Sequence, residues 1–114
     1  MHHNKLLKTE MLSVCLFLSL NTATHADTSG ESLYLQNCMV CHADDGSGSM
    51  PGVLDLDKNR SWSTITVSEL LARLKKGIQG SESGVSMPPK GGNANLTDND
   101  LEKIILYMRE SFLN

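Results

Sequence analysis

The segment Cys38-Met39-Val40-Cys41-His42 constrains this 114-residue chain more than any other feature. It places two thiols one helical turn apart and an imidazole directly after the second thiol. The chain has three cysteines, so a fully paired disulfide framework is excluded unless one cysteine is removed or used otherwise. Aromatic residues make up only 4% of the chain, a thin supply for a core of this size. This shortage suggests that something other than side chains fills the centre.

The first residues are predicted to form a secretory signal peptide. A polar, basic start precedes residues 11–20, a mostly apolar run that is too short to cross a bilayer, which takes about 20 residues. The small residues at 22–26 resemble a signal peptidase site, so we expect cleavage after Ala26. The predicted organisation is therefore a signal peptide over 1–26 and one domain over 27–114. The alternative is a short uncleaved anchor, because Glu10 beside the basic start is unusual for a secretory signal.

Cleavage after Ala26 simplifies the chemistry of the chain. It removes Cys15, which lies inside the apolar run and is interpreted as part of the signal rather than as a lipoprotein cysteine. Cys38 and Cys41 are then the remaining cysteines, and His42 is the remaining histidine. The mature chain keeps 8 basic and 12 acidic residues, for a formal net charge of −4. Nucleic-acid binders usually carry a basic excess, so nucleic acid is not an expected partner.

The predicted fold class is all-α, with three main helices. No segment alternates at period two for long enough to predict a strand. A threonine precedes each predicted helix, and an acidic residue lies three positions after that threonine. This is the pattern of a capping box. The helices and their cap pairs are 29–38 with Thr28 and Glu31, 67–76 with Thr66 and Glu69, and 98–112 with Thr97 and Asp100, and Gly77 is the expected end of the second.

Two long connections separate these helices. They cover about 44–66 and 79–96, whereas connections in compact domains usually span about 4–6 residues. Loops of that length are either functional or disordered. In the second loop Met87 is followed by Pro88 and Pro89, which lower the entropy cost of holding the methionine side chain in place. This part of the loop is therefore predicted to be functional.

The cysteine motif has four possible chemistries. A disulfide between Cys38 and Cys41 would close a loop too short to constrain the unfolded chain, and a thioredoxin-like pair needs a preceding strand. A zinc site needs four ligands, which two cysteines and one histidine do not provide. The remaining chemistry is one covalently attached haem c per chain. The two thiols then form thioethers with the haem vinyl groups, and His42 binds the iron.

The second axial ligand of such an iron would be a methionine. Met39 lies between the two thioethers and cannot reach the opposite face of the ring, and Met108 fits the apolar stripe of the last helix. Met50 is close to His42 and stays an alternative. Met87, 45 residues after His42 in the proline-stiffened loop, is the preferred ligand.

With these motifs in place, the sequence resembles the class I c-type cytochromes, in particular the small bacterial monohaem proteins. The resemblance implies a cytochrome c fold, thioethers at Cys38 and Cys41, and axial ligation by His42 and Met87. It also implies that the first and last helices cross. Residues 51–56 depart from the family pattern, so the carbonyl that orients His42 Nδ1 stays open. The resemblance rests on Gly30, Tyr34, residues 38–42, residues 46–48, residues 87–93 and residues 106–108, with Gly30 and Tyr34 expected near Tyr107.

The expected function is transfer of single electrons in the periplasm. Iron with both axial positions filled has no position for a substrate, so we expect a carrier and no catalytic residues. Expected partners are membrane oxidases or reductases and periplasmic dehydrogenases, met through transient contacts and without stable insertion of the mature chain in the membrane. Two alternatives stay open, a haem subunit of a larger dehydrogenase complex and a haem protein that binds gases or other ligands.

Four polar or aromatic residues near the loops have two interpretations. Lys58, Arg60 and Trp62 could donate hydrogen bonds to haem propionates, or they could belong to a solvated loop with Trp62 in a satellite core. Lys90 is expected to be exposed at the haem edge, where it could serve as a docking charge.

Overall fold

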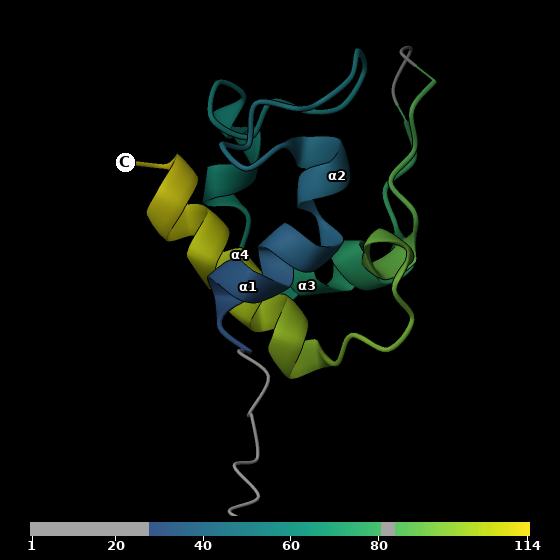
Figure 1. Ribbon diagram of the computed structural model, residues 1–114, viewed down its shortest axis with the longest axis vertical. Helices are drawn as coiled ribbons and strands as arrows, with labels where there is room; N and C mark the ends of the chain where they lie inside the picture. Colours follow the sequence, from purple (N-terminus) through teal and green to yellow (C-terminus); the bar gives the residue numbers. More distant parts are fainter. Residues whose placement is uncertain (1–27, 81–83) are drawn as a thin grey trace, which may run out of the picture.

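The computed structural model describes residues 28–80 and 84–114, and in these residues it contains helices and no strand (Figure 1). The all-α prediction is confirmed. The signal-peptide prediction for 1–26, including Cys15, lies outside the described residues. The elements are α1 (Gly30–Asn37), α2 (Met39–His42), η1 (Arg60–Thr64), α3 (Val67–Lys76), η2 (Pro89–Gly92) and α4 (Asp98–Phe112).

Helices α3 and α4 have the predicted bounds. The Thr97 hydroxyl accepts a hydrogen bond of 3.2 Å from the Asp100 backbone N–H, and the Asp100 carboxylate accepts from the Thr97 N–H at 2.9 Å. The capping box of α4 is therefore complete. In α3 the Thr66 hydroxyl caps the Glu69 N–H, but the Glu69 carboxylate pairs with Arg73 at 2.6 Å. The predicted box of α3 is thus only half formed, because a cationic partner lies one turn further along the helix.

The start of α1 differs from the prediction. The N-cap is Ser29, whose hydroxyl accepts from the Ser32 N–H at 3.1 Å, and not Thr28. The Thr28 carbonyl accepts a hydrogen bond of 3.2 Å from the Lys103 ammonium, which holds Thr28 against α4 and outside the helix. The helix ends at Asn37, and Cys38 joins it to the separate short helix α2. The first helix is therefore 30–37 and not 29–38.

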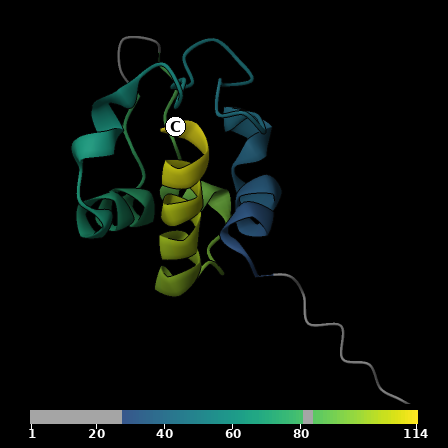
Figure 2. The same ribbon diagram turned by 90° about the vertical axis from the view of Figure 1, so that its left-hand side faces the viewer.

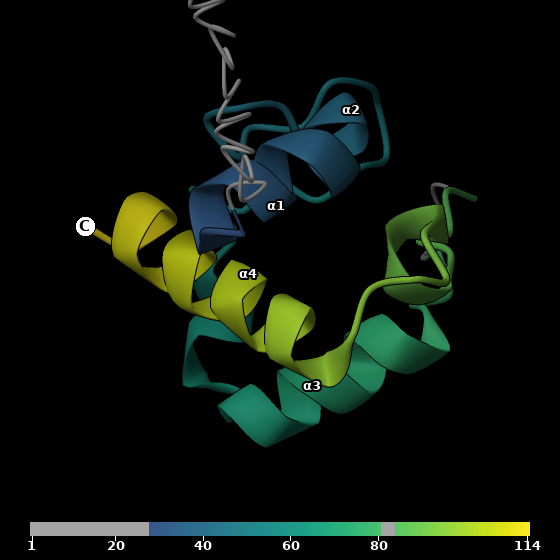
Figure 3. The same cartoon turned by 60° about the horizontal axis from the view of Figure 1, so that its bottom comes forward.

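Helix α4 lies between α1 and α3, as Figures 2 and 3 show from two directions. A Cβ on Gly30 would lie 2.2 Å from the Lys103 carbonyl oxygen, so only glycine permits this approach of α1 to α4. The Tyr34 ring packs against Tyr107 and Phe112, with centroid distances of 5.5 and 5.3 Å. The crossing of the first and last helices that the resemblance implies is confirmed.

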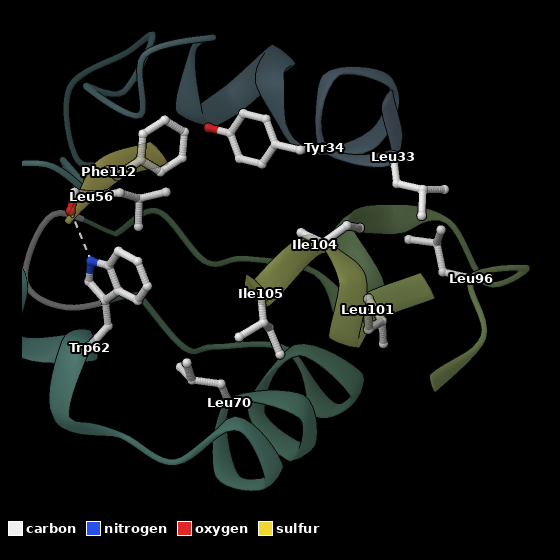
Figure 4. Packing of buried hydrophobic residues seen from close by; sticks show 10 residues of the cluster. All are labelled: Leu33, Tyr34, Leu56, Trp62, Leu70, Leu96, Leu101, Ile104, Ile105 and Phe112. Carbon is white, nitrogen blue, oxygen red and sulfur yellow. Dashed lines mark hydrogen bonds between the residues drawn. The ribbon is translucent and has the colours of Figure 1, made fainter. Parts of the chain in front are cut away.

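The core joins side chains from α1, α3 and α4 with two residues of the first long loop and Leu96 of the second (Figure 4). The first loop contributes Leu56 and Trp62, so it is ordered around η1. In the part of the chain that is described, no helix has the length and apolar character needed to span a membrane. The buried residues are Leu33, Tyr34, Leu56, Trp62, Leu70, Leu96, Leu101, Ile104, Ile105 and Phe112.

Candidate functional site

A cavity of about 370 Å³ brings together the residues that the sequence predicts for the site. Cys38, Cys41, His42 and Met87 all line it, although Met87 is far from the motif in sequence. Met50 and Met108 line it as well, while Met39 does not. The remaining lining is mainly apolar and includes Leu56, Trp62, Leu70, Leu74, Leu96, Leu101 and Ile104.

Cys38 and Cys41 are free thiols, the first between α1 and α2 and the second within α2. Both are half-buried. Burial, and secondarily the neighbouring Cys41, raise the pKa of the Cys38 thiol to about 11. Cys38 is therefore a neutral thiol at pH 7 in the unreacted protein.

His42 ends α2 with its imidazole in the cavity wall. Burial lowers the pKa of His42, so the imidazole favours the neutral form that binds metals. The Leu54 carbonyl opposes this shift and raises the pKa, although buried Nδ1 makes no hydrogen bond of normal geometry among the described residues. The Leu54 carbonyl is thus the candidate for the group that orients His42, which the sequence of residues 51–56 did not identify.

The backbone of Met87 is fixed by an isolated antiparallel bridge to Ile78. The Ile78 N–H donates to the Met87 carbonyl at 2.9 Å, and the Met87 N–H donates to the Ile78 carbonyl at 2.8 Å. A Cβ on Gly77, where φ is 82°, would lie 2.8 Å from the same Met87 carbonyl. The glycine that ends α3 therefore also makes room for the methionine loop. Sequence patterns did not predict this bridge, since one residue pair is too short to show alternation.

Trp62 is a core residue rather than a free donor. Its indole N–H donates to the Leu56 carbonyl at 2.9 Å (Figure 4). The ring is buried and lines the cavity. The only donor of the side chain is therefore already used inside the protein. This favours the core interpretation of Trp62.

Lys58 and Arg60 do not line the cavity. The Lys58 ammonium pairs with Asp55 at 3.2 Å. The Arg60 guanidinium donates to the Leu113 carbonyl at 3.1 Å and pairs with Asp57 at 3.5 Å. Both cations have partners within the fold, which favours the loop interpretation over propionate binding.

Lys90 is half-buried, so the expectation that it is exposed was wrong. Its ammonium donates to the carbonyls of Leu96 at 2.7 Å and Ala94 at 3.3 Å. Its backbone has a φ of 54°, in the left-handed region that disfavours residues with a Cβ. The side chain thus satisfies carbonyls of a tight loop that follows Met87.

The chemistry of the cavity fits the haem that the sequence predicts. Two thiols lie beside a largely neutral imidazole whose buried Nδ1 has an unmet hydrogen-bonding capacity. A thioether sulfur and an extensive apolar lining complete the site. These are the donors and the surroundings that a covalent haem needs.

Comparisons with known proteins point in the same direction. Residues 25–108 match the family described as "Cytochrome C oxidase, cbb3-type, subunit III". The chain is 33% identical over 85 residues to cytochrome c-555 of Prosthecochloris aestuarii, covering 70% of this chain and 82% of that protein. It is 24% identical over 106 residues to cytochrome c-555 of Chlorobaculum tepidum, covering 92% and 94%.

A solved structure supports the fold independently. The KustC0563 c-type cytochrome superposes with a TM-score of 0.53 at 20% sequence identity. The superposition covers 72% of this chain and 95% of that one. The predicted cytochrome c fold is thereby confirmed.

Proposed function

This chain belongs to the c-type cytochrome family, and from that premise we propose that it carries single electrons in the periplasm through one haem c. Family membership implies covalently bound haem and electron transfer. The finer proposal is that Cys38 and Cys41 carry the thioether bonds and that His42 and Met87 are the axial ligands. The observation that supports it is the lining of one apolar cavity by all four side chains.

Bound haem would supply an iron that gains and loses one electron. The protein contributes a neutral imidazole at His42, a soft thioether at Met87 and a cavity with few polar groups. A neutral sulfur ligand and burial both favour the reduced state and raise the potential. With two protein ligands, no axial position is left for a substrate, and we infer a carrier without catalytic residues.

Met87 is preferred over Met50 as the second ligand. The Met87 backbone is fixed by its two hydrogen bonds to Ile78, and the residue is half-buried. Met50 is 47% exposed in the loop after α2. A ligand held in place before the iron arrives loses less conformational entropy on binding.

The ligand assignment is tested by substitution and optical spectroscopy of the ferric protein. We expect Met87→Ala to abolish the weak far-red band of iron bound to a thioether and to lower the reduction potential. Met50→Ala is the matched control and should keep the band. Loss of the band in Met50→Ala with retention in Met87→Ala would move the ligand to Met50. A haem stain after denaturing electrophoresis tests covalent attachment directly.

Export is proposed on the sequence of residues 1–26. The mass of the mature protein should correspond to a chain that begins at Asp27. Expected partners are membrane oxidases or reductases and periplasmic dehydrogenases, bound transiently. A mature protein that keeps residues 1–26 would instead support the short anchor.

A second candidate function is a haem subunit of a larger complex, because the matching family is described as an oxidase subunit. Stoichiometric co-purification with other redox subunits would favour this candidate over a free carrier. A haem protein that binds gases would instead bind carbon monoxide in the reduced state at neutral pH. Absence of such binding is the outcome expected for a carrier with both axial positions filled.

A further inference from the structure

Two asparagines join the end of α1 to the loop that follows Met87. The Asn93 side-chain N–H donates a hydrogen bond of 2.8 Å to Asn37 Oδ1, across 56 positions of sequence. Asn37 directly precedes Cys38 and lines the cavity. We refer to Asn37 and Asn93 as the asparagine pair. The pair connects the segment with the attachment cysteines to the segment with the proposed methionine ligand.

The orientation of both amides is set by their other contacts. Asn37 Nδ2 donates to the Leu33 carbonyl at 2.8 Å, which leaves its Oδ1 as the acceptor for Asn93. Asn93 Oδ1 accepts from the Asn95 backbone N–H at 3.0 Å, which leaves its Nδ2 as the donor. Neither amide can rotate by half a turn without placing like groups together. The pair therefore has one donor and one acceptor, in a fixed order.

The chain between Met87 and Asn93 is stiff. Lys90, Gly91 and Gly92 all have positive φ, of 54°, 63° and 90°, and they turn the chain back toward α1. The Gly91 N–H donates to the Pro88 carbonyl, and the Asn93 N–H donates to the Lys90 carbonyl. A Cβ on Gly91 would lie 3.2 Å from the Asn37 carbonyl oxygen, so the turn passes close to α1. Because this segment is internally bonded, restraint at Asn93 is transmitted to Met87.

We propose that Asn93 is a positioning residue, which acts through Asn37 to hold the Met87 loop against α1 and to slow departure of Met87 from the iron. The inference rests on the proposed ligation by Met87. The Ile78 bridge restrains Met87 on its N-terminal side, and the asparagine pair restrains the loop on its C-terminal side. Breaking the asparagine pair should therefore speed the exchange of Met87 for an added ligand, while Met87 remains the ligand of the parent state.

The test is the rate at which the ferric holoprotein binds imidazole, which must displace the methionine. In Asn93→Asp a carboxylate oxygen faces Asn37 Oδ1, so the donor is lost while the acceptor for the Asn95 N–H remains. We expect imidazole binding about tenfold faster than in the parent protein. Asn95→Asp adds the same charge at an exposed side chain two residues away and should bind imidazole at the parent rate.

A second variant guards against a general folding defect in Asn93→Asp. Asn93→Ala removes the same donor without a charge, and it should also bind imidazole faster. The thermal midpoint of each holoprotein is measured alongside. An unchanged imidazole rate in both variants would overturn the inference, even if the thermal midpoints fall.

The same assay separates this inference from the proposed function. Met87→Ala should bind imidazole without the slow displacement step. If it binds at the parent rate and keeps the far-red band, the ligation by Met87 and the role of Asn93 both fall. If Met87→Ala behaves as expected and both Asn93 variants match the parent, only the role of Asn93 falls.

Discussion

The Tyr34 hydroxyl donates a hydrogen bond of 2.7 Å to the carbonyl oxygen of Ala43, the residue directly after His42. Tyr34 has no exposed surface and lies where α1 crosses α4. Ala43 has φ 63° and ψ 169°, a combination that is nearly restricted to glycine. The phenol therefore holds a strained residue and sets the direction in which the chain leaves the proposed haem ligand.

Removing this hydroxyl should destabilise the folded protein. We expect Tyr34→Phe to lower the free energy of unfolding by about 1–2 kcal/mol, because the Ala43 carbonyl loses its partner. Denaturant unfolding of the holoprotein at pH 7 measures the change. Tyr107→Phe is the control, since the structure shows no hydrogen bond of the Tyr107 hydroxyl to the described residues and the ring is half-buried. Equal losses in the two variants would contradict the prediction.

The contribution of the Tyr34 hydroxyl to the free energy of unfolding should decrease in alkaline solution. Burial, the largest cause, raises the pKa of Tyr34 above its ordinary value of 10.0. Above pH 10 the unfolded chain releases this proton and the folded protein keeps it, so stability falls as pH rises. The stability difference between the parent and Tyr34→Phe should be constant below pH 10 and should narrow by pH 11. A constant difference up to pH 11 would show that burial does not raise this pKa.

Local sequence signals were sufficient to predict a helix start where the capping groups are adjacent in sequence. The starts of α3 and α4 follow from Thr66 and Thr97, whose hydroxyls cap N–H groups three residues later. The start of α1 was missed because Lys103, far away in sequence, binds the Thr28 carbonyl and moves the cap to Ser29. Capping patterns do not contain information on such tertiary contacts.

Sequence patterns identified residues that the structure brings together in one cavity, but not the contacts that hold the loop of Met87 in place. The motif at 38–42 and the prolines after Met87 were visible as patterns. The bridge between Ile78 and Met87 and the Asn37–Asn93 contact were not, since each joins short segments only when the loop is folded. The exposure of Lys90 was predicted wrongly for the same reason, because its acceptors are carbonyls of the folded loop.

Relief of the strain at Ala43 should stabilise the protein. Glycine adopts φ 63° and ψ 169° without a Cβ clash, so we expect Ala43→Gly to raise the free energy of unfolding by about 1 kcal/mol after its larger chain entropy is subtracted. Ala72→Gly, at an exposed position inside α3, should lower it by about 1 kcal/mol. Thermal unfolding of the holoproteins measures both changes. Destabilisation by Ala43→Gly would show that the backbone there is not strained.

The ammonium of Lys90 should stabilise the loop after Met87. Lys90→Met keeps a long side chain but leaves the Leu96 carbonyl without this donor, at an expected cost of about 1 kcal/mol. Lys76→Met, at an exposed position in the last turn of α3, serves as the control for loss of a positive charge. Hydrogen exchange of the Asn93 and Leu96 amides should accelerate in Lys90→Met only. Unchanged exchange at both amides would contradict a structural role of the ammonium.

Without haem the chain should be largely unfolded. A double variant, Cys38→Ser with Cys41→Ser, removes the proposed attachment and leaves an apolar cavity of about 370 Å³. A cavity of that size costs on the order of several kcal/mol, comparable with the whole stability of a small domain. Much of the core borders it and would lose its packing partner. These core residues are Tyr34, Leu56, Trp62, Leu70, Leu96, Leu101 and Ile104.

Far-UV circular dichroism of the purified double variant measures this loss. We expect weak helical ellipticity and no cooperative thermal transition, in contrast to the parent holoprotein. Cys15→Ser is the control, because the cleaved signal peptide is predicted to contain Cys15, and it should keep haem and native ellipticity. A cooperative transition with native ellipticity in the haem-free variant would show that α1, α3 and α4 close on each other without the cofactor. The low aromatic content of 4% argues against that result, since few large side chains are present to fill the space.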